Sequence, residues 1–257
     1  SAFLRCGGGS ILFDCGEGPQ TAARKAHISL MKTDVIALSH YHGDHIFGLP
    51  GLLQTMNCLG RTKRLFITGP GDIKTELSPL MQLAGELGFD IAFVSGELSL
   101  NELGLNFPVG CTLSPFPTAH RVPSCGYVFT LPRPPEFLPE RARSLNIPQW
   151  LWGKLQNGES VSVDGVTIRP EAVCGEPRRG LRVVFRGDTA PCEALVNAAA
   201  GADLLVCDAT YAEDEQAPLA ERYGHCTFTQ AAETARAAGA RRLWLTHYSQ
   251  TVGDPET

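Results

Sequence analysis

Four side chains that commonly bind metal ions occur within six residues of this chain. His40, His42, Asp44 and His45 form the pattern His-x-His-x-Asp-His, directly after the apolar run at residues 35–38. Imidazole nitrogens and carboxylates without cysteine suit zinc, with manganese or iron as rivals. The alternative is a set of loop histidines exposed to solvent. We predict a metal site, because the motif follows an expected strand.

A single loop cannot complete two metal sites, so further ligands must come from elsewhere in the chain. His120, Asp188 and His247 are the candidates, since each lies just beyond an apolar run that reads as a strand. Taken alone, a histidine or aspartate at such a place is more often a hydrogen-bonded cap. The motif at residues 40–45 favours the ligand interpretation for all three.

Composition identifies the class of protein. The 257 residues are 43% hydrophobic and 19% charged, which is typical of a folded domain and excludes disorder, collagen and coiled coil. With 22 basic and 27 acidic residues, the net charge is −5. A negative net charge disfavours a protein that coats nucleic acid nonspecifically. It does not exclude a local site that binds phosphate.

The cysteines and the first residues of the chain indicate in which cellular compartment the protein works. Nine cysteines include no Cys-x-x-Cys pair, so we expect reduced thiols and a cytoplasmic protein. No apolar run reaches the roughly 20 residues that cross a bilayer, and the first residues lack a signal peptide's features. We expect neither export nor a membrane association. The opening residues resemble the middle of a strand, so we expect the natural chain to begin earlier.

Short apolar segments alternate with helical patterns along the chain. We predict strands at 35–38, 65–67, 182–186 and 243–246, and helices at about 19–31, 72–87, 191–200 and 227–238. Such alternation predicts an α/β fold with helices packed on the faces of sheets. The proline-rich segment at about 131–158 breaks the pattern, and we interpret it as an insertion. The basic clusters at 61–64 and 178–179 are predicted to be solvated faces.

Several motifs occur together in an order that points to a known family. They are Asp-Cys-Gly-Glu-Gly at 14–18, the metal motif with Gly-Leu-Pro-Gly at 48–51, Gly-Asp-Thr at 187–189 and Thr-His-Tyr-Ser at 246–249. The chain resembles the metallo-β-lactamase superfamily and, in detail, the ribonuclease Z family. The resemblance implies an αββα sandwich in which helices flank two mixed β-sheets. It also implies a single domain, 1–257, with an irregular arm inserted at about 131–158.

The resemblance implies a ligand for each position of a two-zinc centre. One Zn²⁺ is held by His40, His42 and His120, the other is held by Asp44, His45 and His247, and Asp188 bridges the two. Two such ions can activate a water molecule and hold the attacking and leaving oxygens at phosphorus. A phosphodiester is therefore a suitable substrate.

Three catalytic residues follow from the same resemblance. Asp44 orients the attacking water, and His225, steered by Asp208, stabilises the phosphoryl oxygens or protonates the leaving oxygen. The alternative for His225 is a neighbour of the helix that begins near residue 227. The family usually has glutamate at position 208. Because aspartate is one methylene shorter, we expect its bond to His225 to be weakened or mediated by water.

The resemblance also implies a substrate. It indicates an endoribonuclease that removes the 3′ trailer of precursor tRNA, working as a homodimer. In the arm, Trp150 or Trp152 could stack on RNA or could only hold the arm together, and a Gly-Pro element typical of many family arms is absent. The alternative enzyme is a dinuclear hydrolase of small phosphodiesters, such as cyclic nucleotides, or of lactones. A further alternative is an inactive binding module.

Overall fold

The computed structural model of the chain describes residues 1–176 and 178–249. The chain divides into two compact units, one made of Ser1–Thr130 with Arg182–Thr257 and the other of Leu131–Leu181. None of the helices in the described ranges has both the length and the apolar character needed to cross a membrane.

The first unit contains a five-stranded sheet in the order β1-β2-β3-β4-β5. Its strands are β1 (Ala2–Cys6), β2 (Gly9–Phe13), β3 (Val35–Ala37), β4 (Leu65–Thr68) and β5 (Ile91–Val94). β1 and β2 form an antiparallel hairpin, and the remaining neighbours are parallel. β2, β3 and β4 are buried along their whole length, as expected for parallel strands covered on both faces.

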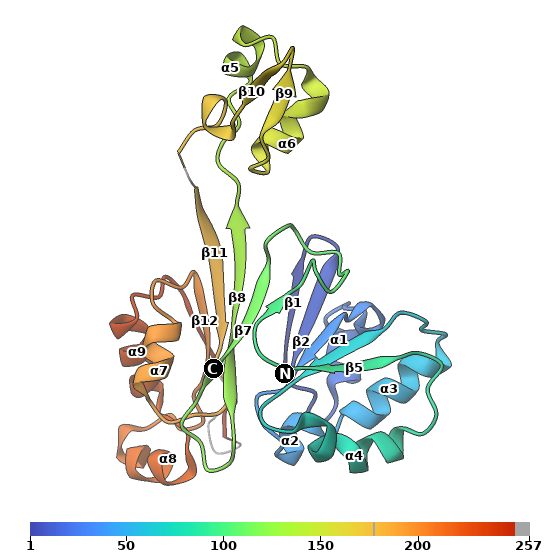
Figure 1. The fold of residues 1–257 in the computed structure, drawn as a ribbon. Helices are drawn as coiled ribbons and strands as arrows, with labels where there is room; N and C mark the ends of the chain where they lie inside the picture. The colour runs from blue at the N-terminus through green and yellow to red at the C-terminus, as the bar shows by residue number, and fades with distance from the viewer. Residues whose placement is uncertain (177, 250–257) are drawn as a thin grey trace. The chain divides into compact units, whose positions relative to one another are not determined.

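Helices cover the outer face of this sheet (Figure 1). They are α1 (Pro19–Lys25), η1 (Leu30–Lys32), α2 (Gly43–Ile46), α3 (Leu49–Cys58) and α4 (Ile73–Ala84). In α3, Leu49, Leu52, Leu53 and Met56 follow the spacing of a helix with one apolar face, and all four are buried. They join a core that also contains residues of β2, β3 and β4.

The second sheet of this unit has six strands in the order β13-β12-β11-β8-β7-β6. Its strands are β6 (Leu98–Ser99), β7 (Thr112–Pro117), β8 (Cys125–Arg133), β11 (Arg178–Phe185), β12 (Leu204–Asp208) and β13 (Leu243–Thr246). β11, β12 and β13 are parallel, whereas β6, β7 and β8 are antiparallel. The helices are α7 (Glu193–Ala198), η4 (Asp214–Gln216), α8 (Ala217–Tyr223) and α9 (Phe228–Ala237). Buried residues of α7 and α9 share a core with β11 and β12.

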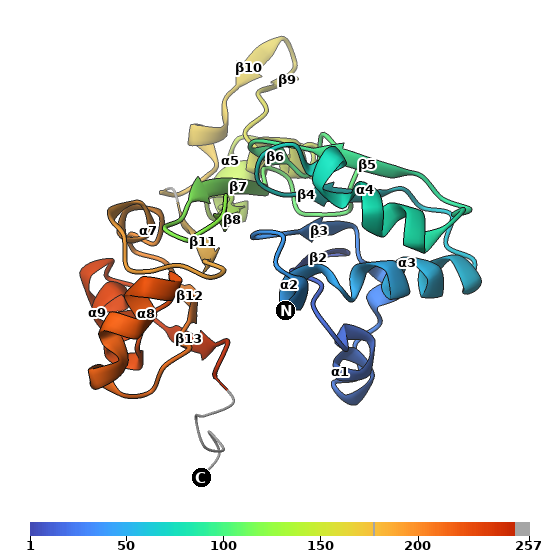
Figure 2. The same ribbon diagram turned by 90° about the horizontal axis from the view of Figure 1, so that it is seen from below.

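The two sheets face each other between these helix layers (Figures 1 and 2). Phe13 of β2 stacks on Phe185 of β11 with ring centroids 4.8 Å apart. The hydroxyl of Tyr127 in β8 donates to the carbonyl of Leu38, 2.7 Å away, just after β3. The predicted αββα sandwich with two mixed sheets is therefore confirmed.

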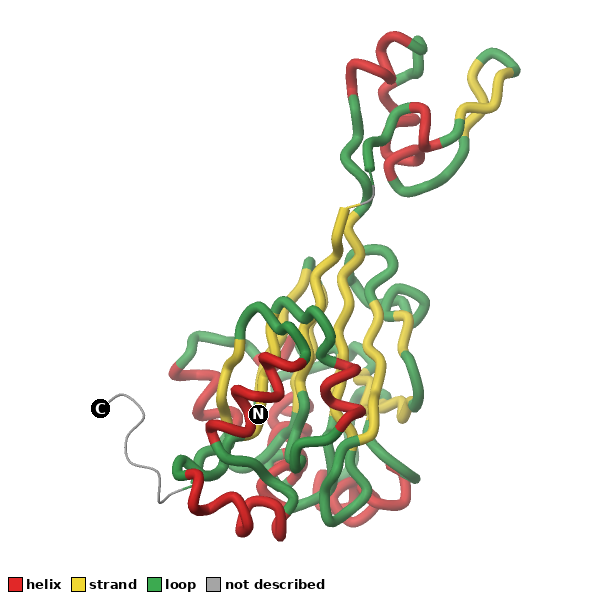
Figure 3. Tube along the Cα trace, turned by 90° about the vertical axis from the view of Figure 1, so that its left-hand side faces the viewer, coloured by secondary structure: helices red, strands yellow, loops and turns green. Residues whose placement is uncertain are grey.

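The second unit contains regular structure where the sequence predicted an irregular arm (Figure 3). It includes α5 (Pro139–Ser144), η2 (Gln149–Leu151), α6 (Trp152–Gln156), the antiparallel hairpin β9 (Val161–Val163) and β10 (Val166–Ile168), and η3 (Pro170–Ala172). Seven buried residues, including Leu151, Leu155 and Val173, form its own core. The unit begins at the predicted insertion but continues to Leu181 rather than to about residue 158. The apolar residues after 158 are needed to close that core.

Other local predictions differ from the structure for physical reasons. The helix predicted at 19–31 ends at Lys25, because His27 adopts a left-handed φ of 54°. The helix predicted at 72–87 ends at Ala84, before Gly85 with φ 68°. Arg61 does not lie on a solvated face. It is 6% exposed and donates to the backbone carbonyls of residues 31, 63 and 64.

Candidate metal centre

The carboxyl ends of parallel strands bring the candidate residues to one region of the first unit. His40 follows β3, Asp188 follows β11, Asp208 ends β12, and His247 follows β13. Parallel strands present their carboxyl ends at the same edge of a sheet, and the two sheets are packed face to face. Residues that are more than 200 positions apart therefore meet.

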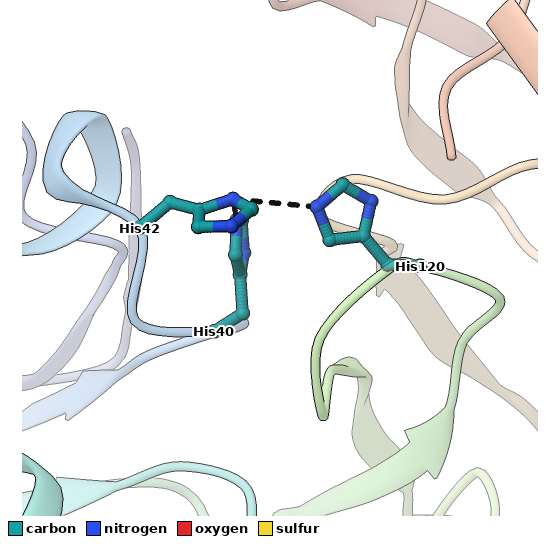
Figure 4. Close-up of side chains that lie close together, drawn as sticks. All are labelled: His40, His42 and His120. Carbon is teal, nitrogen blue, oxygen red and sulfur yellow. Dashed lines mark hydrogen bonds between the residues drawn. The ribbon is translucent and has the colours of Figure 1, made fainter. Parts of the chain in front are cut away.

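The first cluster consists of three histidines. His40 Nε2 lies 2.9 Å from His42 Nδ1, and His120 Nε2 lies 3.4 Å from the same atom. His40 and His42 come from the loop between β3 and α2, and His120 lies in the loop after β7 (Figure 4). One nitrogen of each ring lies within 4.8 Å of the others, so the three nitrogens can converge on one ion.

The second cluster consists of Asp44, His45, Asp188 and His247. Their ligand atoms also lie within 4.8 Å of one another. His247 Nε2 is 3.2 Å from Asp44 Oδ2, and His45 Nε2 is 3.2 Å from Asp188 Oδ2. Asp44 and His45 lie on the short helix α2, and both side chains contact His247, which follows β13.

Asp188 lies between the two clusters. Its Oδ2 is 3.4 Å from His247 Nε2 and 4.0 Å from His40 Nε2, which belongs to the first cluster. The side chain is buried, at 3% exposed. The structure thus brings together all seven residues predicted as metal ligands, with one carboxylate shared between the groups.

Comparison with known proteins places the chain in a family. Residues 1–63 match a family described as the metallo-beta-lactamase superfamily, and residues 148–248 match one described as a beta-lactamase superfamily domain. A ribonuclease Z from Agathobacter rectalis is 40% identical over 97% of this chain and 81% of the relative. The chain belongs to the ribonuclease Z family.

Further relatives extend this result. A ribonuclease Z from Methanosarcina mazei is 41% identical, covering 95% of this chain and 79% of the relative. Among solved structures, the short form of human tRNase Z has a TM-score of 0.66 and 27% identity, covering 96% of this chain and 85% of that one. The predicted resemblance to ribonuclease Z is confirmed, and the metallo-beta-lactamase fold of the family implies that the chain binds divalent metal.

The donor set of this ribonuclease Z family member fits such an ion. His45 Nε2 is buried and has no hydrogen-bond partner within the described ranges, although nearby carboxylates are only a few ångströms away. A buried nitrogen that makes no hydrogen bond costs free energy unless another group, such as a metal ion, binds it. The ligand set is nitrogen and oxygen only, which suits a divalent transition metal.

Partners on the far side of the histidine rings hold the inward nitrogens in place. His45 Nδ1 lies 2.8 Å from Asp14 Oδ2, and His40 Nδ1 lies 3.0 Å from Ser39 Oγ. His120 Nδ1 lies 2.9 Å from the Gly224 carbonyl. Metal-binding histidines characteristically use their second nitrogen in this way, which fixes the tautomer and the ring orientation.

The charges of the two clusters differ. Burial lowers the pKa of His40 to about 3, helped by the charge of His45. Burial also lowers the pKa of His120, so these rings are neutral at pH 7 and have a lone pair for a metal ion. Burial opposes charge on His45, but contacts with the carboxylates of Asp14, Asp188 and Asp44 outweigh it and raise its pKa to about 12. The second cluster therefore attracts a positive charge.

We expect metal binding to release protons. Because its pKa is about 12, His45 is protonated in the metal-free protein at pH 6 to 8 and must lose that proton to bind an ion. Affinity should therefore rise with pH, by roughly tenfold per unit for each proton released. Calorimetric titration of the metal-free protein with metal, in buffers of different ionisation enthalpy, measures the number of protons released. Binding without proton release between pH 6 and 8 contradicts the expectation.

The pair predicted to assist catalysis is also assembled. His225 Nδ1 lies 3.0 Å from Asp208 Oδ2, so the contact is direct and the expectation of a water-mediated bond is wrong. Backbone bonds from Tyr211 to Cys226 and from Phe228 to Tyr211 draw the segment before α9 against the end of β12. This closeness compensates for the shorter aspartate. His225 does not cap α9, since that role belongs to Thr227.

Sequence reasoning missed two residues that support the centre. Asp14 is buried beyond β2 and accepts hydrogen bonds from Ser39 as well as contacting His45. Thr210 donates to Asp208 Oδ1 at 2.7 Å and lies 3.0 Å from His247 Nδ1. A carboxylate directly after a buried apolar run, as Asp14 follows residues 11–13, is the signal that could have revealed the first of these residues.

Replacing Asp14 with asparagine tests its support of His45. The variant keeps the size of the side chain but removes the carboxylate that orients the ring. We expect metal affinity to fall by roughly 10- to 100-fold, the usual effect of losing such a partner. Competition with a chromophoric chelator measures it, and Asp90→Asn, which alters an exposed aspartate, is the control. Affinity equal to that of the wild type excludes the role.

Proposed function

We propose that this chain is a zinc-dependent endoribonuclease that removes the 3′ trailer of precursor tRNA. Membership of the ribonuclease Z family supports a hydrolytic, metal-dependent endoribonuclease, and the relatives are named for that activity. The observation that carries the proposal is the position of Asp188, a member of the second cluster whose Oδ2 also lies 4.0 Å from His40 Nε2 of the first, with the Asp208–His225 pair beside it. Small phosphodiesters and lactones are the less favoured substrates, because relatives that match nearly the whole chain at 36–40% identity are ribonuclease Z proteins.

The metal assignment is two zinc ions per chain, with manganese or iron as substitutes. The first cluster would hold one ion and the second cluster the other, with Asp188 as the ligand available to both. The ligands are His40, His42 and His120 for the first ion and Asp44, His45 and His247 for the second. When bound, the ions supply Lewis-acid polarisation and a lowered pKa for water.

The chain's own residues move the protons of the reaction. Asp44, whose Oδ2 lies 3.2 Å from His247 Nε2 and 3.4 Å from His45 Nε2, would orient the attacking water and accept its proton. His225 presents Nε2 to the substrate, because its Nδ1 is bonded to Asp208. It protonates the leaving 3′ oxygen as the bond to phosphorus breaks. The products are a tRNA with a free 3′-hydroxyl and a trailer with a 5′-phosphate.

The second unit is the RNA-binding arm of a chain that otherwise forms a single metallo-β-lactamase domain. Its two tryptophans differ in environment. The indole N–H of Trp152 donates to the Ile147 carbonyl, 2.9 Å away, and its ring centroid lies 5.2 Å from that of Phe137. Trp152 therefore holds the unit together. Trp150 is 75% exposed and is the residue available to stack on a base. Arg141 and Lys154 are exposed on the same unit.

Separate substitutions of Trp150 and Trp152 distinguish the role of one in RNA binding from the role of the other in packing. We expect Trp150→Ala to weaken binding of precursor tRNA by roughly tenfold, since stacking on a base contributes about 1–3 kcal/mol, without changing the melting temperature. Trp152→Ala should instead destabilise the unit by about 2 kcal/mol or more. Filter binding and thermal unfolding measure these effects. Unchanged RNA affinity in the Trp150 variant excludes the stacking role.

We extend the proposal to a cytoplasmic homodimer, which the resemblance to ribonuclease Z supports. All nine cysteines lie within the described ranges and are free thiols, which is compatible with a reducing compartment. Light scattering of the purified protein measures the oligomeric state.

Incubation with two substrates tests the activity. Purified protein is given precursor tRNA or bis(p-nitrophenyl) phosphate, with and without a chelator, and the RNA ends are mapped. We expect chelator-sensitive release of the trailer with a 3′-hydroxyl on the tRNA. Cleavage of the small ester alone would favour the small-molecule hydrolase, and cleavage of neither would favour a binding module.

A further inference from the structure

Two arginines share one aromatic ring next to the metal centre. The guanidinium carbon of Arg121 lies 5.0 Å from the centroid of the Tyr223 ring, and that of Arg222 lies 5.7 Å from it. Arg121 directly follows His120, and Tyr223 is the last residue of α8, two residues before His225. Both arginines are exposed and Tyr223 is half-buried.

Backbone contacts place this group against the catalytic residues. The His120 and His225 rings lie 5.4 Å apart, and His120 Nδ1 bonds to the carbonyl of Gly224, which links Tyr223 to His225. Gly224 has φ 73°, and a Cβ there would lie 2.6 Å from His120 Nδ1. Only glycine permits this close approach without strain. The charge of Arg121 reaches His42 as well, where it adds to the effect of burial in lowering the pKa.

The donors of both guanidinium groups are available to a ligand. Among the residues that the structure describes, no carboxylate lies within 4.0 Å of Arg121 or Arg222, and neither side chain donates to a protein acceptor. A cation–π contact with a ring uses the charge of the guanidinium and none of its N–H groups as hydrogen-bond donors, so these donors can still bind an anion. Two like charges beside one ring repel each other, and an anion between or beside them would offset that cost.

We propose that Arg121, Arg222 and Tyr223 form a binding site for a phosphate of the RNA strand that adjoins the scissile phosphodiester. The inference rests on the proposed function. In it, the two arginines and Tyr223 bind a phosphate next to the scissile one, and the metal centre acts on the scissile phosphate itself. Guanidinium N–H groups match the two free oxygens of a phosphodiester, and such contacts fix the register of a strand without reading its sequence. The site therefore positions the trailer junction over the metal centre.

Glutamine variants of the holoenzyme test the site. Arg121→Gln and Arg222→Gln are compared with Arg236→Gln, which removes the same charge from the last turn of α9. That control lies eight residues beyond the start of α9, about 12 Å along the helix. Precursor tRNA and bis(p-nitrophenyl) phosphate serve as substrates, and kcat/KM for the RNA is measured at several salt concentrations.

We expect each site variant to raise KM for precursor tRNA by roughly tenfold, as loss of a charged phosphate contact does. The slope of log kcat/KM against log salt should become shallower by about 0.7 per arginine. Hydrolysis of the small ester, which has no second phosphate, should stay within about twofold of the wild type, and Arg236→Gln should change neither substrate. Arg121→Lys keeps the charge and should restore most of the salt slope.

Two outcomes overturn the inference. One is a wild-type KM and salt slope for the RNA in both glutamine variants. The other is an equal loss on both substrates with a lower melting temperature, which would mean that the arginines only hold the end of α8. If the wild type cleaves the small ester but not precursor tRNA, the proposed function fails and the inference fails with it. The wild-type measurement thus separates the two failures.

Discussion

Replacing Asp188 with asparagine should lower kcat/KM for precursor tRNA by roughly 10³-fold, the scale of losing one strong electrostatic group in an active site. The carboxylate oxygen Oδ2 lies 3.2 Å from His45 Nε2, 3.4 Å from His247 Nε2 and 4.0 Å from His40 Nε2. No other carboxylate among the described residues approaches both clusters in this way. Asparagine is nearly the same size but carries no charge, so one or both ions should be lost. Metal content after dialysis and cleavage rate measure the two effects together.

A matched substitution controls for the loss of one negative charge. Asp164 is exposed in the turn between β9 and β10 and has φ 50°, a conformation that asparagine also tolerates. Asp164→Asn should keep the metal content and the cleavage rate of the wild type. An Asp188→Asn protein that retains two ions and full activity would show that the carboxylate is a structural neighbour only.

The second large effect is expected from His225→Asn. Loss of a group that protonates a leaving oxygen costs roughly 10²- to 10⁴-fold in kcat. The seven ligand residues remain in this variant, so metal content should not change. Single-turnover cleavage of precursor tRNA, with zinc analysis on the same sample, measures both quantities.

The control for this variant is His27→Asn. His27 is exposed after α1 and has a left-handed φ of 54°, which asparagine accepts. The control should cleave at the wild-type rate. A His225→Asn protein that cleaves within about threefold of the wild type would remove His225 from the mechanism, because proton transfer contributes far more than that.

The candidate ligand residues could be predicted from the sequence because they lie in the segments that follow strands β3, β7, β11 and β13. The motif at 40–45 is local, and the strand-end positions of Asp188 and His247 follow from the alternation of strands and helices. The geometry of the Asp208–His225 pair could not be predicted. It depends on backbone bonds between the segments at 209–211 and 226–228, which no spacing in the sequence reveals.

Two parts of the fold differ from the sequence prediction, one for a local reason and one because of long-range packing. The helix α3 was not predicted, although Leu49, Leu52 and Met56 have helical spacing, because Pro50 and Gly51 resemble a turn. A proline in the first turn is compatible with a helix. The second unit was predicted to be shorter and irregular, because its core joins residues on both sides of residue 158, such as Leu155 and Val173.

The most direct test is the position of the metal ions themselves. Anomalous diffraction from crystals grown with zinc should show two peaks per chain. One should lie among His40, His42 and His120, and the other among Asp44, His45 and His247, with Asp188 in contact with both. A single peak, or two peaks that do not share Asp188, would contradict the two-ion centre on which the proposed function rests.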